Sequence, residues 1–194
     1  WGIDGDSFEG YLFPETYQFS DEESSQEIIN RMVEEYKKHF TDNFQDRRKK
    51  LGMSEKEVIT LASIIEGEAI YNRERPLISG VYHNRLERGM RLQADPTIQY
   101  IVDDGPRRLF NKDLKIKSPY NTYLNYGLPP GPINNPGIES IKAALFPANT
   151  ENLYFVARGD GYHTFSQTKK GHNIAKKAFH KLRQMARRQK AKKG

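Results

Sequence analysis

The sequence predicts an α+β fold, with a helix-rich body and a small antiparallel sheet that includes a β-hairpin in the C-terminal half. Three observations lead to this prediction. Apolar residues recur at helical spacing in several segments, two of which begin with a capping box. Two strand-like runs flank a tight turn at 160–161. No run approaches the roughly 18 apolar residues of a membrane-spanning helix, and the 194 residues can bury the core of one domain.

Two helices are indicated by their N-termini. Ser24 and Glu27 form a capping box before apolar residues that recur at helical spacing as far as Phe40. Ser54 and Glu57 form another box. In the helix that follows, one face collects the apolar residues Val58, Leu61, Ala62, Ile65 and Ala69. We expect each of these helices to bury one face.

Further helices are indicated by proline. A third helix is expected over 74–88, with a proline in its first turn and a glycine just past its end. Asp95-Pro96 and Asn135-Pro136 each resemble an N-cap followed by the first helical residue. They predict short helices over 95–102 and 138–146.

Two segments supply the expected sheet. Residues 8–19 are rich in aromatic side chains and are interrupted by Gly10 and Pro14, which predicts a short strand with a turn. Residues 153–157 and 162–166 flank Asp160-Gly161, a strong hairpin signal. We expect these segments to form one small antiparallel sheet.

The last helix is strongly basic. It carries an apolar stripe, but 169–194 hold eleven Lys and Arg and no acidic residue. The other 20 basic residues are outnumbered by 25 Asp and Glu. We assign 1–186 to one domain and 187–194 to a basic C-terminal tail. A solvated helix and attraction to an anionic surface (phospholipid, teichoic acid or nucleic acid) both explain the charge, and the sequence leaves that choice open.

Several kinds of chemistry are excluded. The absence of cysteine rules out disulfides, thiolate catalysis and Cys-ligated zinc. The five histidines are scattered without ligand-like spacing, so we predict no metal and no cofactor. No Gly-rich phosphate loop, zinc-protease helix or nucleophile elbow is present. The chain begins with Trp1 rather than Met, so we expect it to be part of a longer protein.

Two glutamates are the candidates for acid–base chemistry. Glu66 and Glu68 lie on opposite margins of the apolar face of the second capped helix. A carboxyl group held against apolar surface resists ionisation, so it can stay protonated near neutral pH and serve as a general acid. Both residues are half-sheltered, and a pair of surface glutamates is the plain alternative. Periodicity does not choose between them.

A long connection, 104–137, is the expected ligand-binding loop. It holds six of the ten prolines but also several tyrosines, which argues for order rather than disorder. Aromatic faces and side-chain amides suit a carbohydrate, whose rings stack and whose hydroxyl and acetamido groups form hydrogen bonds. We expect a cleft between the Glu66 helix and this loop.

Several blocks along the chain carry a resemblance to a known family. In order, they are EGYLFPETY at 9–17, LASIIEGE at 61–68, VYHNRL at 81–86, LQADPTIQY at 92–100, SPYNTY at 118–123 and GLPPGPINNP at 127–136, followed by the hairpin at 154–166 and His172-Asn173. With these blocks, the chain resembles the YceG-like family of endolytic murein transglycosylases. The resemblance covers most of the chain, and it makes 1–186 a YceG-like catalytic domain.

The resemblance implies a lytic transglycosylase that cuts peptidoglycan strands internally between MurNAc and GlcNAc and so limits nascent strands. The family's catalytic glutamate matches Glu66. Members are usually anchored by one N-terminal helix, with a LysM-like region before the catalytic domain. The expected location is the extracytoplasmic face of the bacterial cytoplasmic membrane, with the cell-wall synthesis machinery as a possible partner and no nucleic acid.

Further residues are candidates for holding the sugar. Their polar or aromatic side chains lie in the matching blocks, although capping explains Asp95 and Asn135 equally well, and solvent exposure explains Asn84 and Arg85. The full set is Glu68, Asn84, Arg85, Gln93, Asp95, Tyr120, Asn121, Thr122, Tyr123, Asn135, His163 and Phe165.

The reaction needs only one carboxylate. Hydrolytic glycosidases generally use two, whereas here Glu66 would protonate the leaving oxygen and then deprotonate the MurNAc 6-hydroxyl, which closes a 1,6-anhydro ring. No second catalytic carboxylate is evident from the sequence. Two alternatives remain: a peptidoglycan-binding scaffold with little turnover, and a nucleic-acid-binding domain that uses the basic tail.

Overall fold

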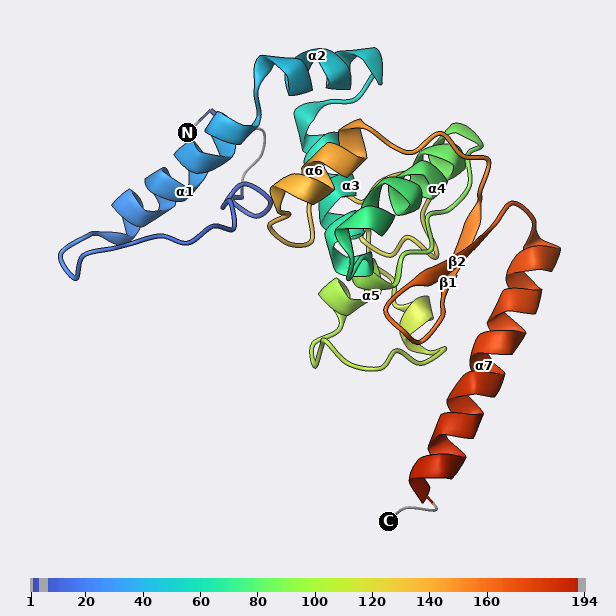
Figure 1. The fold of residues 1–194 in the computed structure, drawn as a ribbon. Helices are drawn as coiled ribbons and strands as arrows, with labels where there is room; N and C mark the ends of the chain where they lie inside the picture. The colour runs from blue at the N-terminus through green and yellow to red at the C-terminus, as the bar shows by residue number, and fades with distance from the viewer. Residues whose placement is uncertain (1, 4–6, 192–194) are drawn as a thin grey trace.

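Helix α3 (Glu55–Glu68) runs through the centre of the molecule (Figure 1). It packs against α6 (Ile138–Leu145) and α4 (Arg75–Glu87), and α5 (Asp95–Ile101) lies beside its C-terminal end. The capping box of Ser54 and Glu57 is present as predicted. Every residue from Val58 to Ile65 is buried, so α3 is enclosed on all sides rather than on the single face that periodicity predicted.

The structure, a computed structural model, describes residues 2–3 and 7–191, with the side chains of 186, 187 and 189–191 left aside. The remaining elements of this part are α1 (Ser25–His39), α2 (Asp42–Lys50), the 3-10 turns η1 (Asn72–Glu74) and η2 (Asp113–Lys115), strands β1 (Tyr154–Ala157) and β2 (His163–Ser166), and α7 (Lys169–Ala191). No described helix is long and apolar enough to cross a membrane.

The predicted α+β fold is confirmed, but the sheet is smaller than expected. It consists of β1 and β2 alone, antiparallel, with Phe155 opposite Phe165. Residues 8–19 were expected to form a strand and do not. Gly10 has φ +91°, Tyr11 N–H donates to the Phe8 carbonyl in a turn, and the segment then runs alongside α1 (Figure 1). Buried aromatic side chains, rather than a strand ladder, hold it in place.

Two predicted helix caps are also wrong. Helix α5 begins at Asp95 with Ala94 as its N-cap, and α6 has Gly137 as its N-cap. The carboxylate of Asp95 and the amide of Asn135 are therefore free for other contacts. Helix α2 was not expected, because its only buried residue is Phe44 and it shows no apolar stripe.

Helix α7 projects from one side of the molecule against the hairpin (Figure 1). It continues as one helix through residue 191, so the expected boundary at 186/187 falls inside it; residues 192–194 of the basic tail lie outside the described residues. The division into domain and tail stays a prediction.

Candidate active site

The last turn of α3 carries both candidate glutamates out of the core. Ile65 is fully buried, whereas Glu66 and Glu68 are half-buried and Gly67 between them is exposed. A Cβ on Gly67 would come within 2.7 Å of the Pro96 ring, so α5 packs directly on this turn. The absence of a side chain at 67 therefore sets how closely α5 approaches the two carboxyl groups.

Glu66 is fixed by contacts on both oxygens. Its Oε1 accepts a hydrogen bond from Arg75 Nη2 at 3.0 Å, and its Oε2 accepts one from the backbone N–H of Gly137 at 3.1 Å. Arg75 is buried and is itself held by Asn72 Oδ1 and Ser140 Oγ. Three segments (η1, α4 and the start of α6) thus orient this one carboxylate, whose side chain remains 31% exposed.

Glu68 lies in a different environment. Its Oε1 accepts a hydrogen bond from the hydroxyl of Tyr82 at 2.9 Å. Burial, with the nearby carboxylate of Asp95 as the second cause, raises the pKa of Glu68 to about 7. The same burial raises the pKa of Tyr82 well above its usual value, which keeps that hydroxyl a donor. Glu68, not Glu66, therefore carries the sheltered carboxyl group that the pattern of the sequence described.

A pocket of about 470 Å³ opens beside Glu68. It lies between the end of α3, α5 and the 104–137 loop, where the sequence placed a cleft. Its walls combine carboxylates, amides, an aromatic ring and prolines: Gly67, Glu68, Asp95, Pro96, Gln99, Tyr100, Pro106, Ile133 and Asn134. Glu66 is not among these lining residues, because it lies on the opposite margin of the last turn of α3.

Four of the predicted sugar-binding residues lie at or near this pocket, and Glu68 is one of them. Asp95 lines it, and its Oδ1 accepts a hydrogen bond from the hydroxyl of Tyr123 at 2.5 Å. Burial and the Asp95 charge raise the pKa of Tyr123. The ring of Tyr120 packs on Tyr100 with centroids 4.8 Å apart, which continues the aromatic wall.

Five other predicted sugar-binding residues are engaged inside the protein. Asn84 donates to the carbonyls of Thr150 and Asn152, and buried Arg85 donates to those of Leu92 and Leu153. The side-chain amide of Asn121 donates to the carbonyls of Leu114 and Ile116. The hydroxyl of Thr122 accepts from the N–H of Ala94 and bonds to the hydroxyl of Thr97. The side-chain oxygen of Asn135 accepts from the N–H groups of Gly10 and Leu12. In this conformation they shape the loops around the pocket, and contact with a sugar stays a prediction.

The last three candidates lie elsewhere. His163 donates its backbone N–H to Glu74 Oε1, and its Nδ1 lies 2.9 Å from Glu74 Oε2, which fastens β2 to η1. Phe165 packs on Phe155 behind it. Gln93 is exposed and adopts φ +49°, and its backbone N–H donates to the Thr122 carbonyl.

Sequence reasoning missed Arg75 and Tyr82, the two residues that contact the carboxyl groups of Glu66 and Glu68. Neither is close to its glutamate in the sequence, and an arginine or tyrosine in an amphipathic helix gives no signal of its own. No group of three His, Asp or Glu side chains within the described residues could hold a metal ion.

A fixed carboxylate, a carboxyl group with a raised pKa, and a pocket with amide and aromatic walls together form a candidate site for acid–base chemistry. Residues 3–178 match the YceG-like family model, and the chain belongs to this family.

Related proteins agree with this membership. An endolytic murein transglycosylase of Bacillus subtilis is 43% identical over 171 residues, covering 88% of this chain and 48% of its own length. One from Streptococcus pneumoniae is 33% identical, covering 90% of this chain and 33% of its own. The crystal structure of a yceG-like protein from Listeria monocytogenes superimposes with a TM-score of 0.79 at 43% identity, covering 86% of this chain and 54% of that one. The chain thus spans about half the length of these relatives, or less.

Proposed function

We propose that this chain is the catalytic domain of an endolytic murein transglycosylase, which cleaves the MurNAc–GlcNAc bond of peptidoglycan and leaves 1,6-anhydro-MurNAc ends. The observation that carries the proposal is the 43% identity to the Bacillus subtilis enzyme over a stretch covering 88% of the chain. The oriented carboxylate of Glu66 and the adjoining pocket support the same proposal, because they offer an acid–base group beside a space for a ligand.

Glu66 is proposed as the catalytic acid and base. Protonated Glu66 gives its proton to the glycosidic oxygen as GlcNAc leaves. The resulting carboxylate takes the proton of the MurNAc 6-hydroxyl, whose oxygen attacks C1 and closes the anhydro ring. Arg75 suits the second step, because it stands beside the anionic carboxylate and holds it in one direction.

The pocket beside Glu68 is proposed to bind the glycan. The rings of Tyr100 and Tyr120 offer faces for stacking on sugar C–H groups. Among the amides of the pocket wall, Gln99 is bonded at both ends to the backbone of Arg107, and Asn134 Nδ2 donates to the Ser63 carbonyl. Asn134 Oδ1 is buried without a protein partner, which leaves an acceptor for a ligand or for water. These features match a neutral polymer better than a phosphorylated one.

The structure adds two carboxyl groups that the single-carboxylate mechanism does not use. Glu68 and Asp95 both line the pocket, so a hydrolytic enzyme with a second carboxylate is the chemical alternative. Internal attack by the 6-hydroxyl is favoured because a well-placed group in the same molecule has a very large effective concentration. The two reactions differ in their products, which makes them separable.

Mass spectrometry of products from purified sacculi is the test. Anhydro-muropeptides of internal cleavage support the proposal, reducing ends indicate hydrolysis, and binding to sacculi without products indicates a scaffold. Glu66→Gln keeps the shape of the side chain but cannot carry the proton. If Glu66→Gln still releases anhydro products at the wild-type rate, the assignment of Glu66 is wrong.

The cellular setting is also proposed from the family. We expect the full-length protein to be anchored in the bacterial cytoplasmic membrane upstream of this chain, to act on its extracytoplasmic face and to work beside the cell-wall synthesis machinery. Protease protection of the full-length protein in spheroplasts tests the location: the domain should be digested from outside.

A further inference from the structure

Helix α7 leaves most of its apolar stripe uncovered. It meets the hairpin along one margin, where the ring of His172 stacks on Tyr154 and Phe179 lies beside Gly159. The centre of the stripe is exposed to solvent: Ile174 by 62%, Leu182 by 56% and Met185 by 50%. A groove of about 900 Å³ runs between this stripe and the turn of the hairpin.

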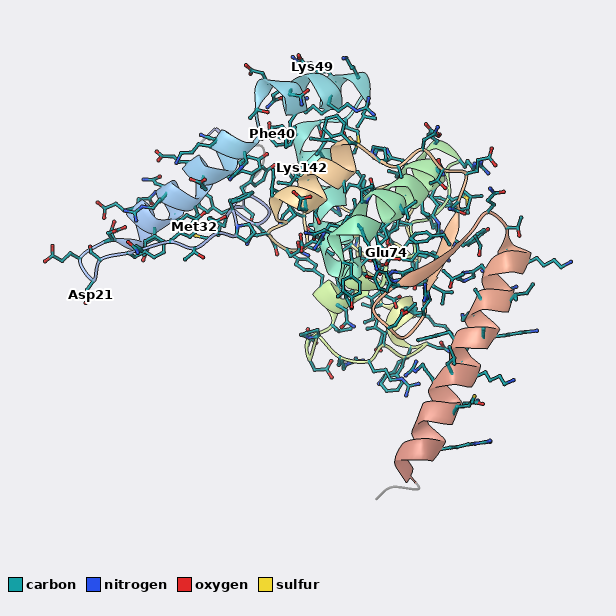
Figure 2. The ribbon with its side chains drawn as sticks, in the orientation of Figure 1. Asp21, Met32, Phe40, Lys49, Glu74 and Lys142 are labelled. Carbon is teal, nitrogen blue, oxygen red and sulfur yellow. The ribbon has the colours of Figure 1, made fainter. Side chains whose placement is uncertain are left out.

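The rest of the surface of α7 is positively charged. Residues 169–191 contain nine Lys and Arg and no Asp or Glu. At 100° per residue, Lys177 and Lys181 lie along one margin of the stripe, and Arg183 lies about 100° beyond Leu182 on the other side of the helix. Among the described side chains of α7, none forms an ion pair with a carboxylate, and many project away from the body into solvent (Figure 2). The cations are therefore available to an external anion.

We propose that α7 lies along a membrane surface that contains anionic lipid. Its apolar stripe would enter the headgroup region while its Lys and Arg contact the lipid phosphates. A clean division into an apolar stripe and a cationic face is the pattern of helices that lie in the membrane interface. The long stems of flanking Lys and Arg reach the phosphates while the stripe is buried.

Other occupants explain only part of the observation. A nucleic acid or another polyanion would account for the charge but gives the exposed Ile174, Leu182 and Met185 nothing to bury against. A second copy would cover the stripe, but pairing two α7 helices brings nine cations of each against the other with no acidic residue between them. A lipid surface satisfies the stripe and the charge together. This inference concerns α7 alone and does not rest on the role of Glu66.

Sedimentation of the intact chain with vesicles tests the proposal. We expect binding to phosphatidylcholine vesicles that contain about a quarter phosphatidylglycerol, and little binding to phosphatidylcholine alone. Leu182→Asp should weaken binding by about tenfold or more, because it places a charge in the middle of the stripe. Lys177→Glu should weaken it by about 25-fold, since it changes the charge by two and each charge near an anionic surface contributes about fivefold.

Two control variants match these changes in chemistry but not in position. Phe19→Asp alters an exposed aromatic residue beside α1, and Lys50→Glu reverses an exposed charge at the end of α2. Both should bind vesicles like the wild type. Ile174→Asp repeats the stripe test at a second exposed site, and circular dichroism of each variant verifies that the helices remain.

Three results would overturn the proposal. The first is no binding to anionic vesicles at low salt. The second is vesicle binding that Leu182→Asp and Ile174→Asp leave unchanged, which would reduce the effect to charge; equally tight binding to a DNA duplex would then identify a polyanion site. The third is a dimer in analytical ultracentrifugation that Leu182→Asp converts to monomer, which would show that a second copy covers the stripe.

Discussion

Glu66 and Glu68 lie two residues apart on the same helix turn, yet the fold surrounds them with opposite chemistry. Glu66 faces a buried cation, Arg75, and a backbone N–H. Glu68 faces a phenol, Tyr82, and a second carboxylate, Asp95. Residues two positions apart on an α-helix point about 200° away from each other, so the two side chains contact different groups of neighbouring residues.

The surroundings of Glu66 orient its carboxylate, whereas the surroundings of Glu68 shelter its carboxyl group from ionisation. Glu66 is oriented by donors on both oxygens, which suits a group that must meet a reacting atom in a defined direction. Glu68 is protected from ionisation, with its pKa raised to about 7. Family membership favours Glu66 as the catalytic group, whereas the pKa argument by itself favours Glu68. Four measurements can separate the two roles.

The largest effect is expected for Glu66→Gln. It should lower the rate of anhydro-muropeptide release by about 10²-fold or more, because general acid–base catalysis by one group contributes about that much. Mass spectrometry of sacculus digests over time measures the rate. Glu68→Gln is the matched control and should keep activity within about tenfold. The reverse ranking would exchange the two roles.

Arg75 should follow Glu66 in importance. Arg75→Lys keeps the charge but loses the planar fork that holds Glu66 Oε1 and Ser140 together. We expect kcat to fall by about tenfold or more with little change in KM, because the carboxylate is misdirected rather than the glycan released. Arg73→Lys changes an exposed arginine two residues earlier and serves as control. Equal loss in both variants would argue against a positioning role for Arg75.

The raised pKa of Glu68 predicts a pH-dependent stability. The folded protein keeps this proton up to about pH 7, whereas the unfolded chain loses it near pH 4.5. The folded state thus binds more protons between these values, and its stability falls as pH rises through this window, by at most about 3 kcal/mol. Besides Asp95 and Tyr82, the charged and titratable groups around Glu68 are Arg85 and Tyr123.

Urea unfolding between pH 4.5 and 8 measures this slope. Glu68→Gln imitates the protonated form, so the difference in unfolding free energy between the variant and the wild type should shift in favour of the variant as pH rises. A pH-independent difference would contradict the environment described for Glu68. The same series with Glu22→Gln, at an exposed position before α1, controls for loss of a glutamate charge.

The smallest effect is expected for Tyr123→Phe. It removes the hydroxyl that donates to Asp95 and keeps the ring. We expect a loss of about 1.5–3 kcal/mol in unfolding free energy, typical of one hydrogen bond to a charged group, and a modest rise in KM if Asp95 helps to hold the glycan. Tyr126→Phe alters an exposed tyrosine of the same loop and should be neutral. A neutral Tyr123→Phe would remove Asp95 and Tyr123 from the proposed binding wall.

Much of the fold followed from local rules. The capping boxes at Ser24 and Ser54 fix where α1 and α3 begin, since each box satisfies N–H groups within four residues of sequence. The hairpin followed from the Asp160-Gly161 turn and its flanking strands. For the aromatic residues of 8–19, the conformation depended on partners distant in sequence, and the strand prediction was wrong.

The candidate site followed the same division. That α3 places two carboxyl groups at the edge of an apolar stripe was readable from its periodicity, and the pocket between α3 and the 104–137 loop lay where the loop's aromatic and amide content placed it. The polar residues singled out for sugar contact divide differently. Asp95 lines the pocket, whereas the side chains of Asn121 and Asn135 form hydrogen bonds with backbone groups. A polar side chain in a loop has the same appearance in sequence whether it faces a ligand or its own backbone.

The sequence by itself determined the described α-helices other than α2, the hairpin, the basic amphipathic character of α7 and the presence of two half-sheltered glutamates, because each depends on residues a few positions apart. Only the tertiary structure decided what distinguishes those glutamates. Arg75 and Gly137 reach Glu66 from α4 and from the start of α6, while Tyr82 and Asp95 reach Glu68 from α4 and α5. Electrostatic environment depends on distances of a few ångströms between groups far apart in sequence, and packing alone sets those distances.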